Sequence, residues 1–233
     1  MIAGLQKLTL LDFPGKVACT VFLAGCNYRC PFCHNAELFG GKVEPLMTEA
    51  EFFTFLEGRK GLLEGVCVSG GEPTLTPTLE AFLQKIKALG FAVKLDTNGS
   101  RPQVLKALAE KGLLDYVAMD VKSSRDGYAA ATGVPADTNA VEESLRFLLT
   151  GTLPYELRTT LVAQLHNEDT VRDMGSWVTG LVPGKIPTNW YLQSFVDRDT
   201  VVFSGLTAPT ENAVFHYQKC LSEFVTNVTI RNT

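Results

Sequence analysis

Three cysteines lie close together near the start of the chain, in the stretch CNYRCPFCHN. Cys26, Cys30 and Cys33 follow a C-x3-C-x2-C spacing, and His34 comes directly after the third thiol. Large cytosolic proteins seldom use cysteines as disulfides. A group of cysteines this dense therefore indicates a metal-binding or a catalytic site. The kind of metal that such a triplet could hold decides the functional interpretation.

An iron–sulfur cluster fits these thiols better than zinc does. Structural zinc usually takes four ligands in two pairs, whereas this chain offers one triplet, and His34 is an awkward fourth ligand because it adjoins Cys33. Disulfides are disfavoured because the number of cysteines in this stretch is odd and the loop that carries them is short. Closely spaced thiolates can wrap a [4Fe–4S] cubane, and three of them leave one iron open to a ligand that is not protein.

Composition is that of an ordinary globular protein. Of 233 residues, 45% are hydrophobic and 20% are charged, so a sizeable buried core is expected. The net charge of −4 argues against a general nucleic-acid binder, which usually has a basic excess. Neither a long apolar span nor a signal-peptide pattern is present, so we expect a cytoplasmic protein without a membrane partner.

Short β-rich runs alternate with longer helix-like runs along the chain. The predicted strands cover residues 17–24, 65–70, 91–99, 114–122, 155–163 and 190–196, with one more at 227–232. The predicted helices cover residues 48–61, 76–90, 101–112, 139–151, 167–181 and 208–224. The first of them begins with Thr48 as a candidate N-cap and Glu51 three residues later.

This alternation predicts an α/β fold with a parallel sheet and helices on its outer face. Six βα repeats fall short of a closed eight-fold barrel, so we expect one domain over residues 1–233 with a partial (β/α)6 TIM-like barrel. Such barrels place their chemistry at the carboxyl ends of the strands. The polar motifs occur there: the cysteine loop, SGGEP at 69–73, DTNG at 96–99, DVKSS at 120–124 and Arg158.

The cysteine triplet, with an aromatic residue just before its third member, resembles the signature of the radical S-adenosylmethionine superfamily. The likeness extends from TLLDFPGKVACTVFLAGCNYRCPFCHN through GGEP, DTNG, DVK and Arg158. These motifs resemble those of glycyl-radical enzyme activases, most closely the single-domain anaerobic ribonucleoside-triphosphate reductase activating proteins. The resemblance implies the partial-barrel radical S-adenosylmethionine core and one [4Fe–4S] cluster on Cys26, Cys30 and Cys33.

The same resemblance implies S-adenosylmethionine at the open iron and roles for further residues. Lys122 and Arg158 join the cluster cysteines as catalytic candidates, and His34 with Asp96 could hold a monovalent cation. The stretch YLQSF, however, departs from the Met- and His-bearing segment of relatives that bind this cation. The candidate cofactor contacts are Phe32, Gly70, Gly71, Glu72, Asp96, Thr97, Asn98, Asp120, Lys122 and Arg158.

Each motif also has a purely structural interpretation. SGGEP and DTNG could be turns, the second with a helix N-cap. Asp120 and Lys122 lie two residues apart on one strand face, so their role could be no more than a salt bridge. Arg158 could pair with Glu156 because these residues are also two apart on a strand.

The remaining candidates have weaker motif support. LDFPGK could be a turn between N-terminal strands, or it could present Asp12 to a substrate peptide. Cys19, Cys67 and Cys220 are expected to pack in the core, whereas His166 and His216 receive no role.

The sequence therefore predicts an oxidoreductase that cleaves S-adenosylmethionine to a 5′-deoxyadenosyl radical. The radical would abstract hydrogen from a glycine of a partner, a glycyl-radical enzyme such as anaerobic ribonucleotide reductase, with flavodoxin or ferredoxin as electron donor. One alternative is a radical S-adenosylmethionine enzyme acting on a small molecule, as in deazapurine synthesis. Another is a non-catalytic iron–sulfur electron carrier or a zinc module, although four protein ligands would then be expected.

Overall fold

A computed structural model describes residues 1–39 and 43–231 of the chain. The chain divides into two compact units. The first contains Met1–Asn27, Glu37–Thr97 and Gln103–Ala118, and the second contains Tyr28–Ala36, Asn98–Pro102 and Met119–Thr233. A single domain over residues 1–233 stays a prediction, and its residues 40–42 and 232–233 lie outside the described part of the chain.

The first unit is built on parallel strands. β2 (Ala18–Leu23), β3 (Gly65–Gly70) and β4 (Ala92–Thr97) pair in parallel, and β1 (Ile2–Thr9) runs antiparallel to β2. Strand β5 (Tyr116–Asp120) leads from this unit to the second. The helical segments are η1 (Ala36–Leu38), α1 (Glu49–Glu57), η2 (Pro73–Leu75), α2 (Leu79–Ala88) and α3 (Pro102–Glu110).

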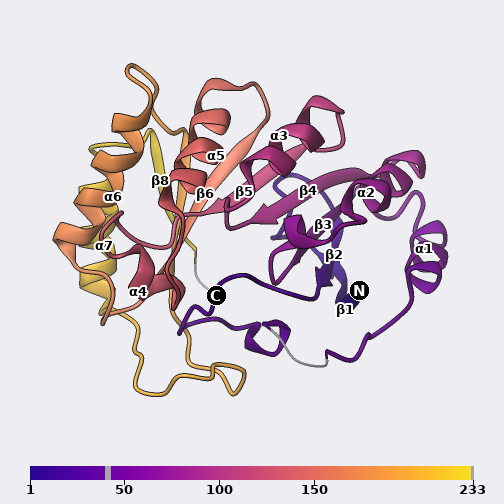
Figure 1. Cartoon of the computed structure of the whole chain (residues 1–233), viewed down its shortest axis with the longest axis horizontal. Coiled ribbons are helices and arrows are strands. Elements are labelled where there is room, and N and C mark those ends of the chain that lie inside the picture. The colour runs from indigo at the N-terminus through magenta and orange to yellow at the C-terminus, as the bar shows by residue number, and fades with distance from the viewer. Residues whose placement is uncertain (40–42, 232–233) are drawn as a thin grey trace. The chain divides into compact units, whose positions relative to one another are not determined.

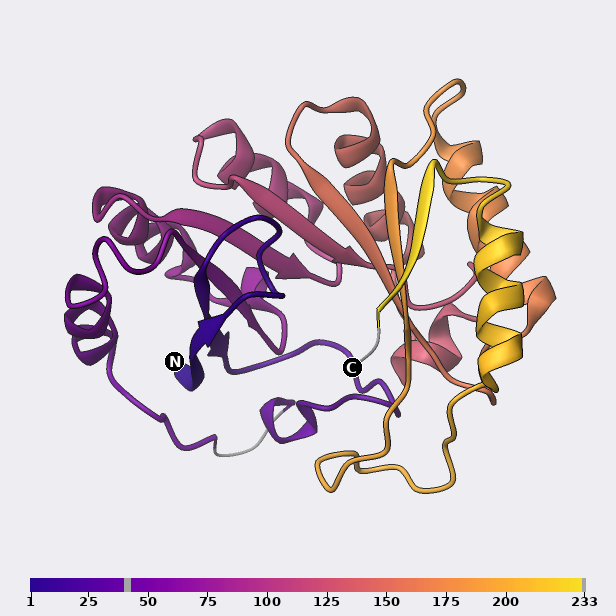
Figure 2. The same cartoon turned by 180° about the vertical axis from the view of Figure 1, so that it is seen from behind.

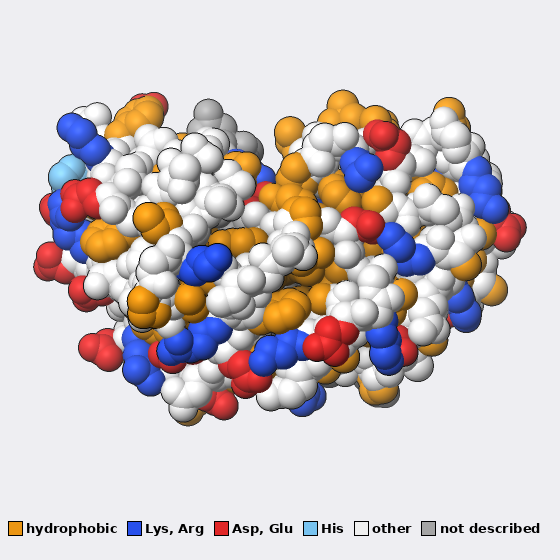
Figure 3. All heavy atoms as spheres, turned by 90° about the horizontal axis from the view of Figure 1, so that it is seen from above, with side chains coloured by type: hydrophobic (Ala, Val, Ile, Leu, Met, Phe, Trp, Pro, Cys, Tyr) orange, Lys and Arg blue, Asp and Glu red, His pale blue; other side chains and the backbone are white. Residues whose placement is uncertain are grey.

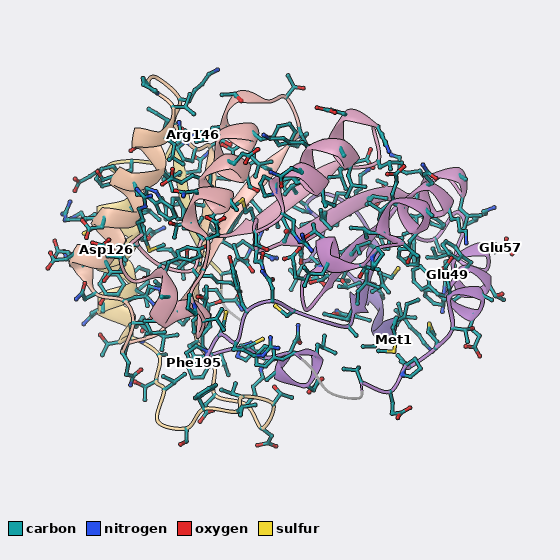
Figure 4. The ribbon with its side chains drawn as sticks, in the orientation of Figure 1. Met1, Glu49, Glu57, Asp126, Arg146 and Phe195 are labelled. Carbon is teal, nitrogen blue, oxygen red and sulfur yellow. The ribbon has the colours of Figure 1, made fainter. Side chains whose placement is uncertain are left out.

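Helix α1 begins where the sequence predicts. The Thr48 hydroxyl accepts a hydrogen bond from the Glu51 amide, and the Glu51 carboxylate accepts one from the Thr48 amide at 2.7 Å. This capping box satisfies backbone donors that would otherwise lack partners. Figure 4 labels Glu49 and Glu57, the first and last residues of the helix. Phe52 and Phe82 stack between α1 and α2 with ring centroids 5.4 Å apart, which fixes this helix pair in the core of the unit.

The second unit repeats the α/β pattern. Strands β6 (Tyr155–Leu161), β7 (Asn189–Ser194) and β8 (Asn227–Arg231) pair in parallel. The helices are α4 (Tyr128–Thr132), α5 (Thr138–Thr150), α6 (Glu168–Leu181) and α7 (Glu211–Leu221), and α6 and α7 lie side by side (Figures 1 and 2). One face of the strands buries Leu157, Leu161, Trp190 and Leu192, each burial favouring folding by about 1.5–3 kcal/mol.

Strand order in the sheet follows the chain from β1 to β8. The seven expected strands and six expected helices are all present, with ends shifted by a few residues. Asn232, at the end of the last expected strand, lies outside the described residues. Helix α4 was not expected, because its five residues are too few to show a helical repeat of apolar positions. β1 was expected only as the strand before the LDFPGK turn, without bounds.

Two surface properties accord with the composition. Among the described residues, no helix is both long enough and apolar enough to cross a membrane. On the face shown in Figure 3, acidic and basic side chains are interspersed. Such mixing differs from the basic stripe that is typical of nucleic-acid binding.

Candidate functional site

The SGGEP motif approaches the chain before Cys26 at a distance that only glycine permits. Gly70 ends β3 with φ +125°, and a Cβ atom there would lie 2.2 Å from the Leu23 carbonyl oxygen. A Cβ atom on Gly71 would lie 2.1 Å from the Gly25 carbonyl oxygen. Both carbonyl oxygens belong to the backbone, so neither clash could be relieved by a change of side-chain rotamer. The glycines therefore bring the turn against the residue that precedes the first cysteine.

Glu72 is a buried carboxylate that joins two of the motifs. Its side-chain oxygen Oε1 accepts hydrogen bonds from the Thr74 amide at 3.1 Å and from the Thr74 and Thr97 hydroxyls at 2.5 and 2.8 Å. The residue is 1% exposed, and its own amide donates to the Gly25 carbonyl at 2.7 Å. Thr97 ends β4 at the start of DTNG, so Glu72 connects SGGEP, DTNG and the segment before Cys26.

Lys94 is a polar residue of this region that the sequence analysis missed. It is fully buried on β4, where its ammonium pairs with the Asp96 carboxylate and lies 3.7 Å from the Cys67 sulfur. Positions 94 and 96 share a strand face, so the signal was the spacing of a lysine and an aspartate within an apolar run. Lys94 supplies positive charge next to a predicted cofactor contact. Cys67 is buried as expected, and so is Cys19, where burial raises the thiol pKa to about 12.

The cysteine loop of the second unit is anchored on helix α4. The Arg29 amide donates to the Thr132 carbonyl at 2.7 Å. Gly133 ends the helix with φ +68°, and a Cβ atom there would lie 2.2 Å from the Arg29 carbonyl oxygen. The next turn of the loop is closed by a hydrogen bond of 3.1 Å from the Cys33 amide to the Cys30 carbonyl. Cys30 is buried and Cys33 is half-buried in this turn.

An ion-pair cluster of one carboxylate and two cations lies in the second unit. The Asp120 carboxylate accepts from the Lys122 ammonium at 2.8 Å and from Arg158 Nε at 3.1 Å. Burial alone lowers the pKa of Lys122, but Asp120 and the thiolates of Cys30 and Cys33 outweigh it and raise the pKa. Lys122 therefore stays charged at neutral pH. Asp120 therefore pairs with two cations in this cluster.

The aromatic ring of Phe32 lies beside this cluster, with its centroid 6.0 Å from the Lys122 ammonium. That distance is compatible with a cation–π contact. The predicted salt bridge between Asp120 and Lys122 is thus present, and the structure adds Arg158 and Phe32 to it.

Arg158 and Glu156, which the sequence offered as an alternative pair, each have a charged partner outside their own strand. Glu156, whose side chain is fully buried, makes a bidentate pair with Arg231 of β8 at 2.9 Å for both bonds. The Arg231 guanidinium lies 3.6 Å from the centroid of the Tyr191 ring on the intervening strand β7. Arg158 instead reaches Asp120, because the Val121 amide donates to the Arg158 carbonyl and so sets the two segments side by side.

His34 and Asn98 are both held by local contacts. The His34 Nε2 atom lies 2.7 Å from the Val196 carbonyl oxygen, and its ring stacks on Phe195 with centroids 5.8 Å apart. A carbonyl only accepts, so Nε2 is the donor and Nδ1 of the neutral ring keeps its lone pair. The Asn98 side chain accepts from the Ser100 amide at 2.9 Å, which confirms a turn at the end of DTNG.

Asp12 and the remaining cysteine also have defined positions. The Asp12 carboxylate accepts from the Thr20 hydroxyl at 2.5 Å in the turn between β1 and β2, and its contact with a substrate peptide stays a prediction. Cys220 is buried on α7, as expected, but its sulfur also lies 3.7 Å from His216 Nε2.

His166, which received no role from the sequence, supports the Lys122 segment. It is 2% exposed, and its Nδ1 atom accepts from the Val162 amide at 3.0 Å. Its Nε2 atom lies 2.9 Å from the Lys122 carbonyl oxygen, to which it donates. Burial lowers the pKa of His166, although its hydrogen bonds to Lys122 and Val162 act in the opposite direction. The neutral ring is therefore the form that holds this segment.

His166 should make stability depend on pH. Because its pKa is lower in the folded chain than the ordinary value near 6.5, the unfolded chain binds the proton first as pH falls. The free energy of unfolding should drop as the solution is taken from about pH 7.5 to about pH 5.5. Urea titrations should show a shallower pH dependence for His166→Gln than for the unmodified chain. Equal slopes would contradict this role for His166.

The chain is similar in sequence to several known proteins. A Methanocaldococcus jannaschii protein, provisionally named a glycyl-radical enzyme activating enzyme, is 29% identical over 99% of this chain and 95% of its own. The pyruvate formate-lyase-activating enzyme of Clostridium pasteurianum is 33% identical over 57% of each chain. A 7-carboxy-7-deazaguanine synthase of Thermococcus kodakarensis is 29% identical over 46% of this chain and 50% of its own.

Solved structures and a family model show the fold and the family. A domain of pyruvate-formate lyase-activating enzyme from Bacteroides vulgatus superposes with a TM-score of 0.56 at 17% identity, covering 72% of this chain and 98% of that one. QueE from Escherichia coli superposes with a TM-score of 0.55 at 16% identity, covering 100% of this chain and 92% of that one. The predicted α/β fold with a partial-barrel core is confirmed. The family model described as the radical SAM superfamily matches residues 20–177, more than half of the chain, and this protein therefore belongs to that superfamily, which implies a [4Fe–4S] cluster and S-adenosylmethionine.

Proposed function

We propose that this protein is a glycyl-radical enzyme activase. The observation that carries the proposal is the similarity to the Methanocaldococcus jannaschii protein, which runs over nearly the whole of both chains. Relatives whose names give another activity match between 39% and 66% of this chain. The partner would be a glycyl-radical enzyme, for which anaerobic ribonucleotide reductase is the specific candidate. Flavodoxin or ferredoxin would donate electrons, and the reaction would take place in the cytoplasm.

The residues of the cysteine loop fit an iron–sulfur cluster. Cys26, Cys30 and Cys33 are proposed as its three ligands, because closely spaced cysteine thiolates ligate such clusters. When bound, the cluster and S-adenosylmethionine supply the electron transfer and the 5′-deoxyadenosyl radical that takes hydrogen from a glycine. The protein's task is to bind and orient these groups.

The second unit offers positive charge for an anionic part of the cofactor. Lys122 and Arg158 both pair with Asp120, and these two cations are the groups proposed to attract a carboxylate. We assign the carboxylate of the methionine moiety to this place. Phe32 covers the Lys122 ammonium from one side.

The first unit offers backbone and acceptor groups. Gly70 and Gly71 let the main chain approach a ligand closely, and Glu72, Asp96 and Thr97 are the polar side chains proposed to act there, with Asn98 following in the second unit. A monovalent cation bound by His34 and Asp96 remains a prediction. The proposal does not require it, because the Lys94 ammonium already neutralises the Asp96 carboxylate.

A second candidate function is radical chemistry on a small molecule. The similarity to a 7-carboxy-7-deazaguanine synthase is the observation that favours it. The two functions differ in where the radical ends: on a protein glycine or on a metabolite.

The triplet is tested by removing one ligand. Cys30→Ala should lower 5′-deoxyadenosine formation to background, because three protein ligands are the minimum for this cluster. The measurement is product per chain after anaerobic reconstitution with iron and sulfide, reduction and addition of S-adenosylmethionine. Cys19→Ala is a matched control outside the triplet and should retain activity. Normal cleavage by Cys30→Ala would refute the assignment.

The activase function is tested on the same reconstituted protein. Incubation with a purified anaerobic ribonucleotide reductase should produce a glycyl radical detectable by electron paramagnetic resonance. A partner variant with alanine in place of the target glycine should give no signal. The second candidate would be favoured if 5′-deoxyadenosine formed only when a purine-type metabolite was added and no glycyl radical appeared.

The close approach at Gly71 gives an independent test of the local geometry. Gly71→Ala places a methyl group against the Gly25 carbonyl, next to Cys26, and should lower the iron content per chain severalfold. Gly180→Ala is the control, because a Cβ atom there has nothing within 4 Å and iron content should not change. Unchanged iron in Gly71→Ala would show that this contact does not position the cysteine loop.

A further inference from the structure

Three metal-ligating side chains meet between helices α6 and α7. Glu168 is the first residue of α6, and His216 and Cys220 lie four residues apart on one face of α7. The two helices lie side by side in the second unit (Figure 2). None of the three residues belongs to the motifs that carry the proposed function. We call this group the α6–α7 cluster.

The distances within the α6–α7 cluster are close to those of a zinc site. His216 Nε2 lies 2.7 Å from a Glu168 oxygen, and the Cys220 sulfur lies 3.7 Å from His216 Nε2 and 3.8 Å from the other Glu168 oxygen. Tetrahedral zinc, with bonds of about 2.0–2.3 Å, separates its ligand atoms by about 3.3–3.6 Å. An ion therefore needs only a small widening between Glu168 and His216.

Burial and charge also suit a divalent ion. Cys220 is 1% exposed, whereas the side chains of Glu168 and His216 are about half exposed. An ion can therefore reach Glu168 and His216 from solvent and bind the buried Cys220 thiol between them and the protein interior. Arg172 pairs with Glu168 at 3.0 Å and with Glu223 at 2.9 Å. These two carboxylates and one guanidinium leave one negative charge, and a thiolate at Cys220 raises it to two.

We propose that Glu168, His216 and Cys220 bind one zinc ion, with water as the fourth ligand. A thiolate, an imidazole and a carboxylate together select zinc over magnesium or calcium, which prefer oxygen ligands alone. Binding releases the Cys220 proton to solvent, because zinc takes the thiolate. The ion fastens the start of α6 to α7.

Zinc content gives the first test. The holoprotein is reconstituted anaerobically so that its cluster cysteines are occupied, incubated with zinc chloride and desalted, and zinc and iron are then measured. The unmodified chain should retain one zinc per chain that His216→Gln and Cys220→Ser lack, with iron unchanged. Glu211→Gln, an α7 carboxylate outside the α6–α7 cluster, should retain it. Equal zinc in the unmodified chain and both ligand variants would overturn the proposal.

Two further measurements keep the test decisive if Cys220→Ser folds poorly. Cobalt(II) added to the unmodified chain should give a thiolate charge-transfer band that zinc abolishes, and a spectrum without that band would overturn the proposal. Arg172→Gln removes a cation that competes for Glu168, so its zinc dissociation constant should fall severalfold. A weaker affinity in this variant would overturn the assignment of Glu168 as a ligand, because losing the competing Arg172 cation should only strengthen zinc binding there.

Discussion

The cysteine loop is fixed just before Cys26 and just before Cys30 by contacts in which one backbone runs against another at a distance that only glycine permits. In the first unit the contact joins Gly71 to Gly25, and in the second it joins Gly133 to Arg29. Each is reinforced by a main-chain hydrogen bond, from Glu72 to Gly25 and from Arg29 to Thr132. Thiols that share one cluster must be held within narrow limits, and backbone contacts hold position better than flexible side chains do.

This constraint explains why sequence motifs were so informative here. Gly-Gly in SGGEP could be identified as a functional turn because close backbone approach requires glycine, and the structure shows what is approached. The role of Gly133 was not predictable in the same way. It depends on α4, a helix of five residues, and on a contact with Arg29 more than a hundred residues earlier in the chain. Neither leaves a local pattern in the sequence.

The buried apolar faces of the elements were predictable for a similar reason. The helical spacing of Phe52 and Leu56 and the capping residues of α1 are local, so the structure confirms them. The polar face of the strands was predictable only in part. The spacing of two residues correctly paired Asp120 with Lys122, and the same rule would have paired Lys94 with Asp96.

Arg158 and Glu156 show where that rule stops, because each has a charged partner outside its own strand. Residues two apart on a strand share a face, but their side chains extend outward in parallel, so a partner on a neighbouring segment can be nearer. Arg158 takes Asp120, which lies beside it, and Glu156 takes Arg231, which reaches across the Tyr191 ring from β8. A fully buried Glu156 needs such a bidentate partner, because an unpaired charge there would be costly. Glu156 is thus paired with Arg231 of β8, whereas Arg158 and Lys122 both pair with Asp120.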